Sequence, residues 1–458
     1  MSRRLLVCCV ILLAALAAPA AHAAPPERHV VVISIDGFPA YLLNDPKLPL
    51  PTIRALAAAG ASAEGMHVSN PSVTWPNHTS LITGVRPEKH GVLFNGVLVR
   101  SGAGSPVALD SKRDKADLVR VPTLYDRLHQ AGYSTAEINW PCTRNSESLD
   151  DSFPDVPDNV EHSTPRLRRE LAAAGILSDE TDASFRSLSI VGRDDAWTRA
   201  ACHVIRKRKP HLLLLHLLNV DATHHAEGPQ SQPGYTAVAY ADCCVARVLA
   251  ALDEAGIRDR TTVFIVADHG FSIAKKALKP NVVLRQAELL TSSRPGKIDT
   301  ARAQSFPEGG IGMVYLTDPA TREADRQRVI ELFSGREGIA EVLTPDQFAK
   351  HGLPHPREYE QMADLVLVGQ DGYAFSGSAD GEEFVVPQAT GGISLGNHGF
   401  IATNPKMNAV FVASGAGIKP GVKLGLIENI DVAPTVARVL GQELPGVDGR
   451  VLTEILQP

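Results

Sequence analysis

The sequence is poor in aromatic residues and has no excess of basic residues. Aromatic side chains make up 5% of the 458 residues, so a folded core must be mainly aliphatic. The 45 Lys and Arg residues are outnumbered by 51 Asp and Glu residues, which gives a formal charge of −6. Nucleic-acid binding in general requires a basic surface, so this balance argues against that class of protein. A composition of 44% hydrophobic and 21% charged residues argues against global disorder.

Long apolar runs are absent outside the N-terminus, where residues 1–23 are typical of a signal peptide. Arg3 and Arg4 precede an apolar run at residues 5–18, and Ala21-His22-Ala23 offers small residues before a cleavage site. The run of about 14 residues is shorter than the roughly 20 that cross a bilayer. Loss of the leader, which has two Arg and no acid, would change the charge to −8. We expect an exported protein, periplasmic or secreted, without a membrane anchor in its mature form.

Cysteines are also few, and four lie beyond the leader: Cys142, Cys202, Cys243 and Cys244. Export permits disulfides, but four cysteines allow three full pairings and the sequence does not choose among them. None of the four lies in a CxxC motif, which disfavours a cysteine-based zinc site. The oligomeric state also stays open.

Apolar runs alternate with helical patterns along the chain, as in α/β proteins. Continuous apolar runs predict buried strands at residues 29–35, 211–220, 261–267 and 408–413. Helices are expected at 52–59, 75–83, 122–130, 194–208, 237–255 and 432–440. Residues 274–390 interrupt this pattern and predict an inserted cap subdomain, so the catalytic core would comprise 24–273 and 391–458. Segments 96–118 and 143–190 are expected to be surface excursions.

Three of the predicted strands run into an acid, namely Asp36, Asp221 and Asp268. The carboxyl ends of strands in an open α/β sheet meet at one edge, so these carboxylates are expected to cluster there. Clustered carboxylates repel one another unless a cation is bound. Histidines accompany two of them, since His225 follows Asp221 by four residues and His269 is adjacent to Asp268. His398, in GNHGF, is a further candidate ligand. Asp and His donors without Cys suit a catalytic zinc site, with manganese or iron as alternatives.

The segment at residues 70–84 contains a candidate nucleophile, Thr74, directly before the expected helix at 75–83. Pro76 lies in the first turn of that helix, where its missing N–H costs little. A threonine at this position has an ordinary role as the N-cap residue. It can also serve as a nucleophile, because the positive helix N-terminus and a bound metal would both favour its alkoxide.

These motifs together resemble the alkaline phosphatase superfamily, and within it the nucleotide pyrophosphatase/phosphodiesterase family. The matching segments are ISIDG around Asp36, TWPNHTSLITGVRPEKHGV (74–92), FNG (94–96), DATHHAEGP (221–229), ADHGF (267–271) and GNHGF (396–400). They occur in the family's order from residue 30 to about residue 445. The resemblance implies an alkaline-phosphatase-like three-layer sandwich around a mostly parallel sheet.

The resemblance also implies two zinc ions per chain. One would be held by Asp221, His225 and His398, with His224 the less favoured neighbour of His225. The other would be held by Asp36, Asp268, His269 and the Thr74 oxygen. Asn95 would hydrogen-bond a non-bridging phosphate oxygen. The implied reaction is in-line attack of Thr74 on phosphorus, giving a phosphothreonine that water hydrolyses.

The preferred substrate is less directly indicated. Monoesterase relatives with a threonine nucleophile have a Lys-x-Arg pair in the region that here reads NWPCTRN (139–145), where Arg144 is the one basic residue. We therefore favour diesters of the nucleotide type, with a phosphomonoesterase or phosphonate hydrolase as the alternative. Phe94 and Trp75 are candidate base-stacking residues, and Tyr240 is a weaker one. A catalytically dead, exported metal- or ligand-binding protein is the alternative of another class.

Overall fold

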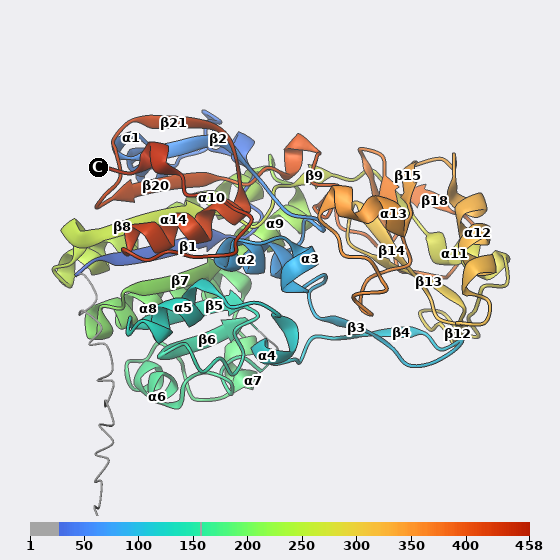
Figure 1. Cartoon of the computed structure of the whole chain (residues 1–458), viewed down its shortest axis with the longest axis horizontal. Helices are drawn as coiled ribbons and strands as arrows, with labels where there is room; N and C mark the ends of the chain where they lie inside the picture. Colours follow the sequence, from blue (N-terminus) through green and yellow to red (C-terminus); the bar gives the residue numbers. More distant parts are fainter. Residues whose placement is uncertain (1–26, 156–157) are drawn as a thin grey trace, which may run out of the picture.

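The computed structural model describes residues 27–155 and 158–458, so the expected leader at 1–23 lies outside the described residues. Its larger part is built on an eight-stranded sheet of order β21-β2-β20-β8-β1-β7-β5-β6 (Figure 1). All strands run in one direction except β20, which is antiparallel to both of its neighbours. The strands are β1 (His29–Ile35), β2 (Ala61–His67), β5 (Thr135–Pro141), β6 (Asp151–Asp155), β7 (Leu212–Leu217), β8 (Thr261–Val266), β20 (Phe411–Gly415) and β21 (Val422–Glu428).

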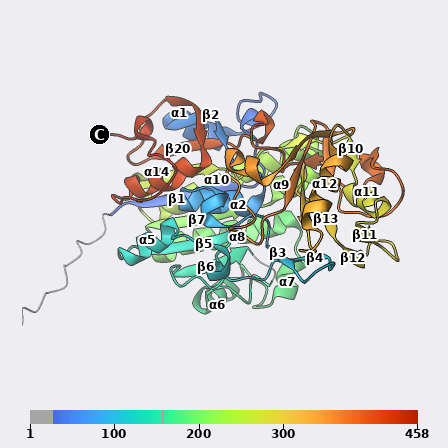
Figure 2. The ribbon, with the colours of Figure 1, turned by 45° about the vertical axis from the view of Figure 1, so that its right-hand side comes forward.

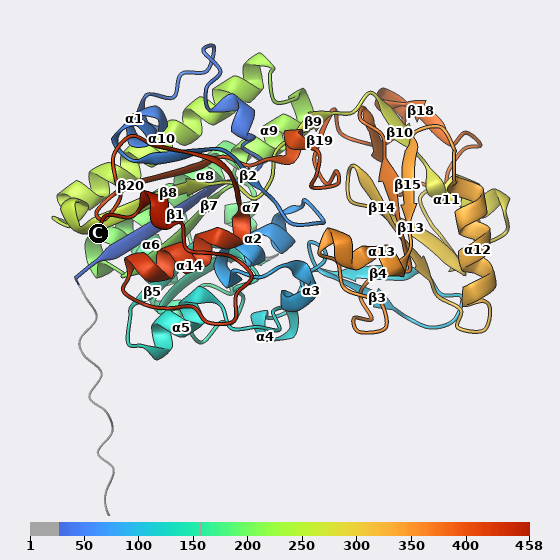
Figure 3. The same cartoon turned by 45° about the horizontal axis from the view of Figure 1, so that its top comes forward.

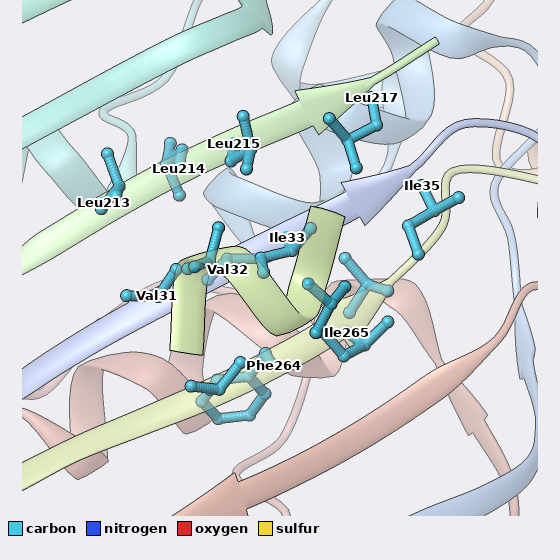
Figure 4. Packing of buried hydrophobic residues seen from close by; sticks show 14 of the residues in the cluster. Val31, Val32, Ile33, Ile35, Leu213, Leu214, Leu215, Leu217, Phe264 and Ile265 are labelled. Atoms are coloured by element: carbon cyan, nitrogen blue, oxygen red, sulfur yellow. The ribbon is translucent and has the colours of Figure 1, made fainter. Parts of the chain in front are cut away.

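Helices cover both faces of this sheet, which confirms the predicted three-layer α/β architecture (Figure 3). On one face lie α1 (Pro51–Ala59), α8 (Ile190–Arg208) and α10 (Gln232–Glu254), and on the other α2 (Thr74–Thr83), α5 (Leu124–Gln130) and α14 (Val432–Val439). The central strands β1, β7 and β8 are buried along their whole length. Their aliphatic side chains form the largest hydrophobic core (Figure 4). Burial on both faces explains why their sequences are continuously apolar.

One predicted strand is shorter than its apolar sequence indicates. We expected a strand at 211–220, but β7 ends at Leu217 and helix α9 (Asn219–Glu227) begins two residues later. The buried carboxylate of Asp194, in α8, accepts the backbone N–H groups of Leu218 (2.9 Å) and Asn219 (3.2 Å), which turns the chain into α9. Asp221 therefore lies in the first turn of a helix, not at the end of a strand.

Helix α10 is the one helix in the described part of the chain that is long and apolar enough to cross a membrane. The expectation that no stretch beyond the leader meets this criterion was therefore wrong. However, 56% of its apolar window is buried inside the fold, where α10 packs against α1, α8 and α9. The core helix of a folded domain meets the same criterion of length and composition.

Much of the chain between residues 274 and 390 forms a second lobe beside the large sheet (Figures 1 and 2). Its elements are β10 (Lys276–Leu278), α11 (Pro280–Gln286), β13 (Ala303–Pro307), β14 (Ile311–Leu316), α12 (Arg322–Phe333), β15 (Ile339–Leu343), α13 (Pro345–Phe348), β16 (Leu365–Gly369), β17 (Tyr373–Phe375) and β18 (Val385–Pro387). A four-stranded antiparallel sheet of order β13-β14-β16-β15 is its centre. The subdomain boundaries at 273 and 391 stay a prediction.

The hairpin of β3 (Val97–Arg100) and β4 (Val107–Asp110) belongs to the region expected to be a surface excursion. Instead, Leu98 and Val107 are buried in a hydrophobic cluster with side chains of β14 and β16. Arg100 also binds the lobe, donating to the Asp364 carboxylate at 3.0 Å and to three backbone carbonyls of the lobe. The hairpin thus fastens the lobe to the large sheet.

The four cysteines of the described residues are free thiols, three of them buried and Cys243 exposed. None of the three possible disulfide pairings is therefore present among the described residues.

Candidate active site

The predicted acidic residues converge at the carboxyl edge of the large sheet. Asp36 follows β1 directly, and Asp268 lies two residues beyond the end of β8. Asp221 reaches the same edge from α9. His398 follows the short strand β19 (Gly396–Asn397), which pairs with β9 (Ser272–Ile273) and so brings His398 beside the segment that contains Asp268.

Asp36, Asp268 and His269 form the first group of possible metal ligands. One ligand atom from each lies within 4.8 Å of the others. His269 Nε2 is 3.5 Å from Asp36 Oδ1 and 3.2 Å from Asp268 Oδ2. All three side chains are at most 1% exposed, yet these three atoms have no hydrogen-bond partner. Buried polar atoms are normally satisfied, so the convergence of these three fits the donor set of a bound metal ion.

Asp221, His225 and His398 are the second predicted group. In the structure, Asp221 and His398 have ligand atoms within 4.8 Å of each other together with His269, and His225 lies outside that set. Asp221 Oδ1 lies 3.4 Å from His225 Nε2 and 3.7 Å from His398 Nε2, and it too has no hydrogen-bond partner. The two groups adjoin, because the rings of His269 and His398 stack with centroids 3.7 Å apart. The second group is the more open one, since the His225 side chain is 29% exposed. His224 instead points its Nδ1 at the Gly37 carbonyl oxygen, 3.2 Å away.

Backbone carbonyls hold the three candidate histidine ligands in a common orientation. Nδ1 of His225 lies 2.9 Å from Gly396 O, that of His269 lies 3.2 Å from Gly270 O, and that of His398 lies 3.1 Å from a carbonyl at residue 72. A carbonyl only accepts, so Nδ1 donates and Nε2 presents its lone pair to the carboxylates. Carbonyl partners of this kind are typical of metal-bound histidines.

The electrostatics of the site fit a divalent cation. Burial, with Asp221 close by, raises the pKa of Asp36 well above its usual range, and burial with Asp36 does the same to the pKa of Asp268. Burial lowers the pKa of His269 well below its ordinary value and that of His398 to about 3. In the metal-free protein these shifts favour the uncharged form of each group, and a bound cation would favour the carboxylate form of the acids while leaving the imidazoles neutral. Oxygen and nitrogen donors without sulfur suit zinc.

Thr74 is the first residue of α2, and the N-cap position before it is occupied by Val73. No side-chain cap is present, so the hydroxyl of Thr74 does not have the ordinary capping role considered above. His78, one turn later, places this helix end at the site. Its Nδ1 lies 2.9 Å from the Thr74 carbonyl oxygen and 3.6 Å from Asp268 Oδ2.

Asn95 lies against the same helix end. Its Oδ1 accepts the backbone N–H of Trp75 at 2.9 Å, which leaves the amide NH2 group to donate to a ligand. Phe94 is 9% exposed, and its ring packs edge-on against Phe306 of the lobe. Trp75 is also buried, in a small cluster of its own. Tyr240 lies on α10 and lines a separate surface cavity of about 490 Å³.

Two further histidines lie beneath the candidate ligands and were not singled out from the sequence. His78 contacts Thr74 and Asp268 as described. His216, on β7, has Nε2 2.9 Å from Asp36 Oδ2. A signal for His216 was present, because it is the one polar residue within the otherwise apolar strand LLLLHL. Its partner could not be inferred without the pairing of β1 with β7.

The fold and its converging carboxylates and imidazoles define an α/β protein of the alkaline-phosphatase-like class. Human ectonucleotide pyrophosphatase/phosphodiesterase 5 superposes with a TM-score of 0.71 and 16% identity, covering 94% of this chain and all of that one. An inactive threonine-to-alanine variant of the murine protein, in complex with AMP, gives a TM-score of 0.69 at 16% identity with the same coverage. At these identities the likeness establishes the fold.

The chain belongs to the type I phosphodiesterase / nucleotide pyrophosphatase family, whose model matches residues 30–401. This is a family of hydrolases, as the motifs predicted. Human ectonucleotide pyrophosphatase/phosphodiesterase family member 1 is 23% identical over 414 residues, 88% of this chain and 39% of that protein. A pyrophosphatase/phosphodiesterase of Schizosaccharomyces pombe is 23% identical over 418 residues, 90% of this chain and 76% of that one. The chain thus spans about two fifths of the human relative's length.

Proposed function

We propose that the protein hydrolyses phosphodiester or pyrophosphate bonds in nucleotide-type substrates, with Thr74 as the nucleophile and two zinc ions as cofactors. The observation that carries the proposal is the pair of adjoining carboxylate–imidazole groups, in which Asp36 Oδ1, Asp268 Oδ2, His269 Nε2 and Asp221 Oδ1 are buried without a hydrogen-bond partner. The end of α2 that contains Thr74 lies beside one of these groups through His78.

The candidate ligands divide between two ions. Asp36, Asp268 and His269, with the Thr74 oxygen, would hold one, and the second group described above would hold the other. When bound, the ions would supply positive charge to the attacking and leaving oxygens of an in-line displacement. Manganese or iron would fit the same oxygen and nitrogen donors.

The roles of the protein groups follow from their positions. The Thr74 oxygen bonds to phosphorus while the bond from phosphorus to the leaving oxygen breaks, which gives a phosphothreonine that water then hydrolyses. The free NH2 group of Asn95 donates to a non-bridging phosphate oxygen. Because its Oδ1 is held by the Trp75 N–H, this donor is oriented before the substrate arrives.

A preference for diesters is supported by the position of Arg144. A monoester has one more negative charge than a diester and gains more from an additional cation. Arg144 is not free to supply it, because its Nε lies 2.8 Å from an Asp114 oxygen and its Nη1 donates to the Lys112 carbonyl. Burial is the largest cause of the raised pKa of Asp36 and of Asp268, followed by the charge of Asp221 for Asp36 and the charge of Asp36 for Asp268.

A nucleotide as the substrate is supported by the family and by the AMP complex of the murine relative. Phe94 remains the candidate contact for a base, although its ring is now known to be largely covered by the lobe. A phosphomonoesterase or phosphonate hydrolase is the alternative on the same scaffold. Export to a periplasm or to the outside remains part of the proposal.

Paired kinetics on the purified, zinc-loaded protein test the substrate class. We expect kcat/KM for a nitrophenyl phosphodiester to exceed that for the matching monoester by roughly tenfold or more, about 1.4 kcal/mol in transition-state binding. A preference for the monoester would move the assignment to phosphatase.

Substitution of Thr74 tests the mechanism. Thr74→Ala should retain bound zinc and lose turnover. Thr83→Ala is the matched control, because the Thr83 hydroxyl lies at the other end of the same helix, where it donates to the Thr79 carbonyl and accepts the Val85 N–H. Undiminished turnover in Thr74→Ala would exclude Thr74 as the nucleophile. Zinc binding well below one ion per chain would contradict the two-metal site.

A further inference from the structure

His216 is fully buried between the candidate metal site and strand β5. It lies directly opposite Ser34 in the parallel pairing of β7 with β1, so its ring reaches toward Asp36 at the end of β1. One ring nitrogen, Nε2, is 2.9 Å from Asp36 Oδ2, and the other, Nδ1, is 2.9 Å from the Asn139 carbonyl oxygen. Both oxygens are acceptors, so the ring holds both of them by donating from both nitrogens, as an imidazolium.

The backbone of β5 is irregular at the point where it meets this ring. Asn139 has a left-handed φ of 62°, and the register of β5 with β6 shifts between Ile138 and Pro141. A non-glycine residue with positive φ is uncommon, although asparagine tolerates it better than most. The side chain of Asn139 donates back to the His216 carbonyl at 3.2 Å. Asn139 and His216 are thus joined twice, and the irregular backbone holds the ring in one orientation.

The two oxygens of Asp36 consequently have different surroundings. Oδ2 is held by His216, whereas Oδ1 has no partner and lies 3.5 Å from His269 Nε2. Asp268 follows the same pattern, since its Oδ1 accepts the backbone N–H of Gly37 at 3.0 Å and its Oδ2 is free. Each carboxylate is therefore fixed by one oxygen and presents the other to the same point. For Asp268 the fixing group is the backbone, and for Asp36 it is the side chain of His216.

We propose that His216 is a positioning residue that fixes the Asp36 carboxylate with a single oxygen directed at the metal group. This inference rests on the proposed function and adds a residue to which neither the motifs nor the comparisons assign a role. The ring of His216 also packs on His78, with centroids 4.2 Å apart, and His78 contacts the Thr74 carbonyl. A displaced ring would therefore disturb both the ligand Asp36 and the start of α2.

Two substitutions that differ by one methylene test the proposal. The amide of His216→Asn reaches the position of Nδ1 and can donate only toward Asn139. The amide of His216→Gln reaches the position of Nε2 and can donate to Asp36. Zinc affinity is measured by competition with a chromogenic chelator, and the unfolding temperature of each metal-free variant serves as the folding control.

We expect His216→Asn to bind zinc roughly 10- to 100-fold more weakly than the parent, as is usual when the partner of a ligand is lost. His216→Gln should stay within a few-fold of the parent, and kcat should follow affinity while KM changes little. Equal affinities for the two variants, whether both high or both low, would overturn the proposal.

His216→Phe provides a second comparison, because it preserves the ring that packs on His78 but has no donor. It should show the same weak zinc binding as the asparagine variant, and parental affinity in this variant would also overturn the proposal. Zinc binding by the unsubstituted protein distinguishes a failure of the proposed function from a failure of the role proposed for His216. A parent that binds no zinc contradicts the proposed function, whereas a parent that binds zinc beside unaffected variants contradicts only the role of His216.

Discussion

Replacing Asp268 by asparagine should stabilise the metal-free protein and weaken the metal-loaded one. Asp268 Oδ1 accepts the Gly37 N–H, and the asparagine oxygen can keep this bond. The new NH2 group would take the place of Oδ2, which lies 3.2 Å from the unpartnered Nε2 of His269. A contact between two lone pairs would thereby become a hydrogen bond. The same change removes a negatively charged candidate metal ligand.

The magnitude follows from the spacing of the carboxylates. Ligand oxygens of Asp36 and Asp268 lie within 4.8 Å of each other. Two unit charges at that distance repel by ~3.5 kcal/mol in an effective dielectric constant of about 20. With an unfolding entropy of ~2.1 cal/mol/K per residue over the roughly 430 described residues, removing this repulsion raises the unfolding temperature by about 4 °C.

The pH dependence has a definite sign. Burial raises the pKa of both carboxyls in the folded, metal-free protein, with Asp221 adding to the rise for Asp36 and Asp36 adding to the rise for Asp268. Their contribution to stability is therefore complete below the unfolded pKa and is lost as the pH rises through the raised folded values. The advantage of Asp268→Asn over the parent should accordingly grow as the pH rises from 5 to 8.

Thermal unfolding with a chelator and with excess zinc checks these expectations. The metal-free variant should unfold at a higher temperature than the metal-free parent at pH 8, and zinc should raise its unfolding temperature by less. Asp242→Asn is a suitable control, because Asp242 is buried but accepts two backbone N–H groups at the start of α1. Asp242→Asn should lower the unfolding temperature both with the chelator and with excess zinc. A metal-free Asp268→Asn protein less stable than its parent at pH 8 would refute the reasoning.

Three further predictions concern single side chains. Asn95→Asp keeps the acceptor for the Trp75 N–H but removes the donor, so kcat/KM should fall roughly 100-fold with zinc content unchanged in metal analysis. Arg144→Ala should leave the ratio of diester to monoester kcat/KM unchanged, because Arg144 is bound to Asp114, and a shift of the ratio toward diesters would show that it does reach the substrate. Burial raises the pKa of Glu137 to about 7, so the contribution of Glu137 to stability is lost as the pH rises from about 4.5 through 7. In Glu137→Gln the unfolding temperature should therefore change less between pH 5 and pH 8 than it does in the parent.

The fold could be predicted from the sequence because its central strands are buried on both faces. Burial makes β1, β7 and β8 continuously apolar, which is visible without knowing their neighbours. The convergence of Asp36 and Asp268 also followed, since the chemistry of an open α/β sheet collects at the carboxyl ends of its strands.

What the sequence could not provide depends on contacts between distant segments. The end of β7 is set by Asp194, which lies 24 residues before the amide of Leu218 that it binds. The capping role considered as the alternative for Thr74 does not apply, because α2 starts one residue earlier than expected and the cap is Val73. Helix boundaries depend on which groups satisfy the first backbone amides, and here Asn95 satisfies that of Trp75.

His216 and Asn139 show why a prediction from motifs finds the candidate metal ligands but not the residues that orient them. A ligand is recognisable from its type and spacing, as Asp221 and His225 are on one face of α9. The group that orients a ligand can come from any segment that the fold brings near, and its own type is unremarkable. His216 reaches Asp36 across a strand pairing that joins residues 180 apart. Its orientation depends in turn on a left-handed Asn139 in a third strand. Such partners are found only when the hydrogen bonds of each ligand are traced outward, oxygen by oxygen.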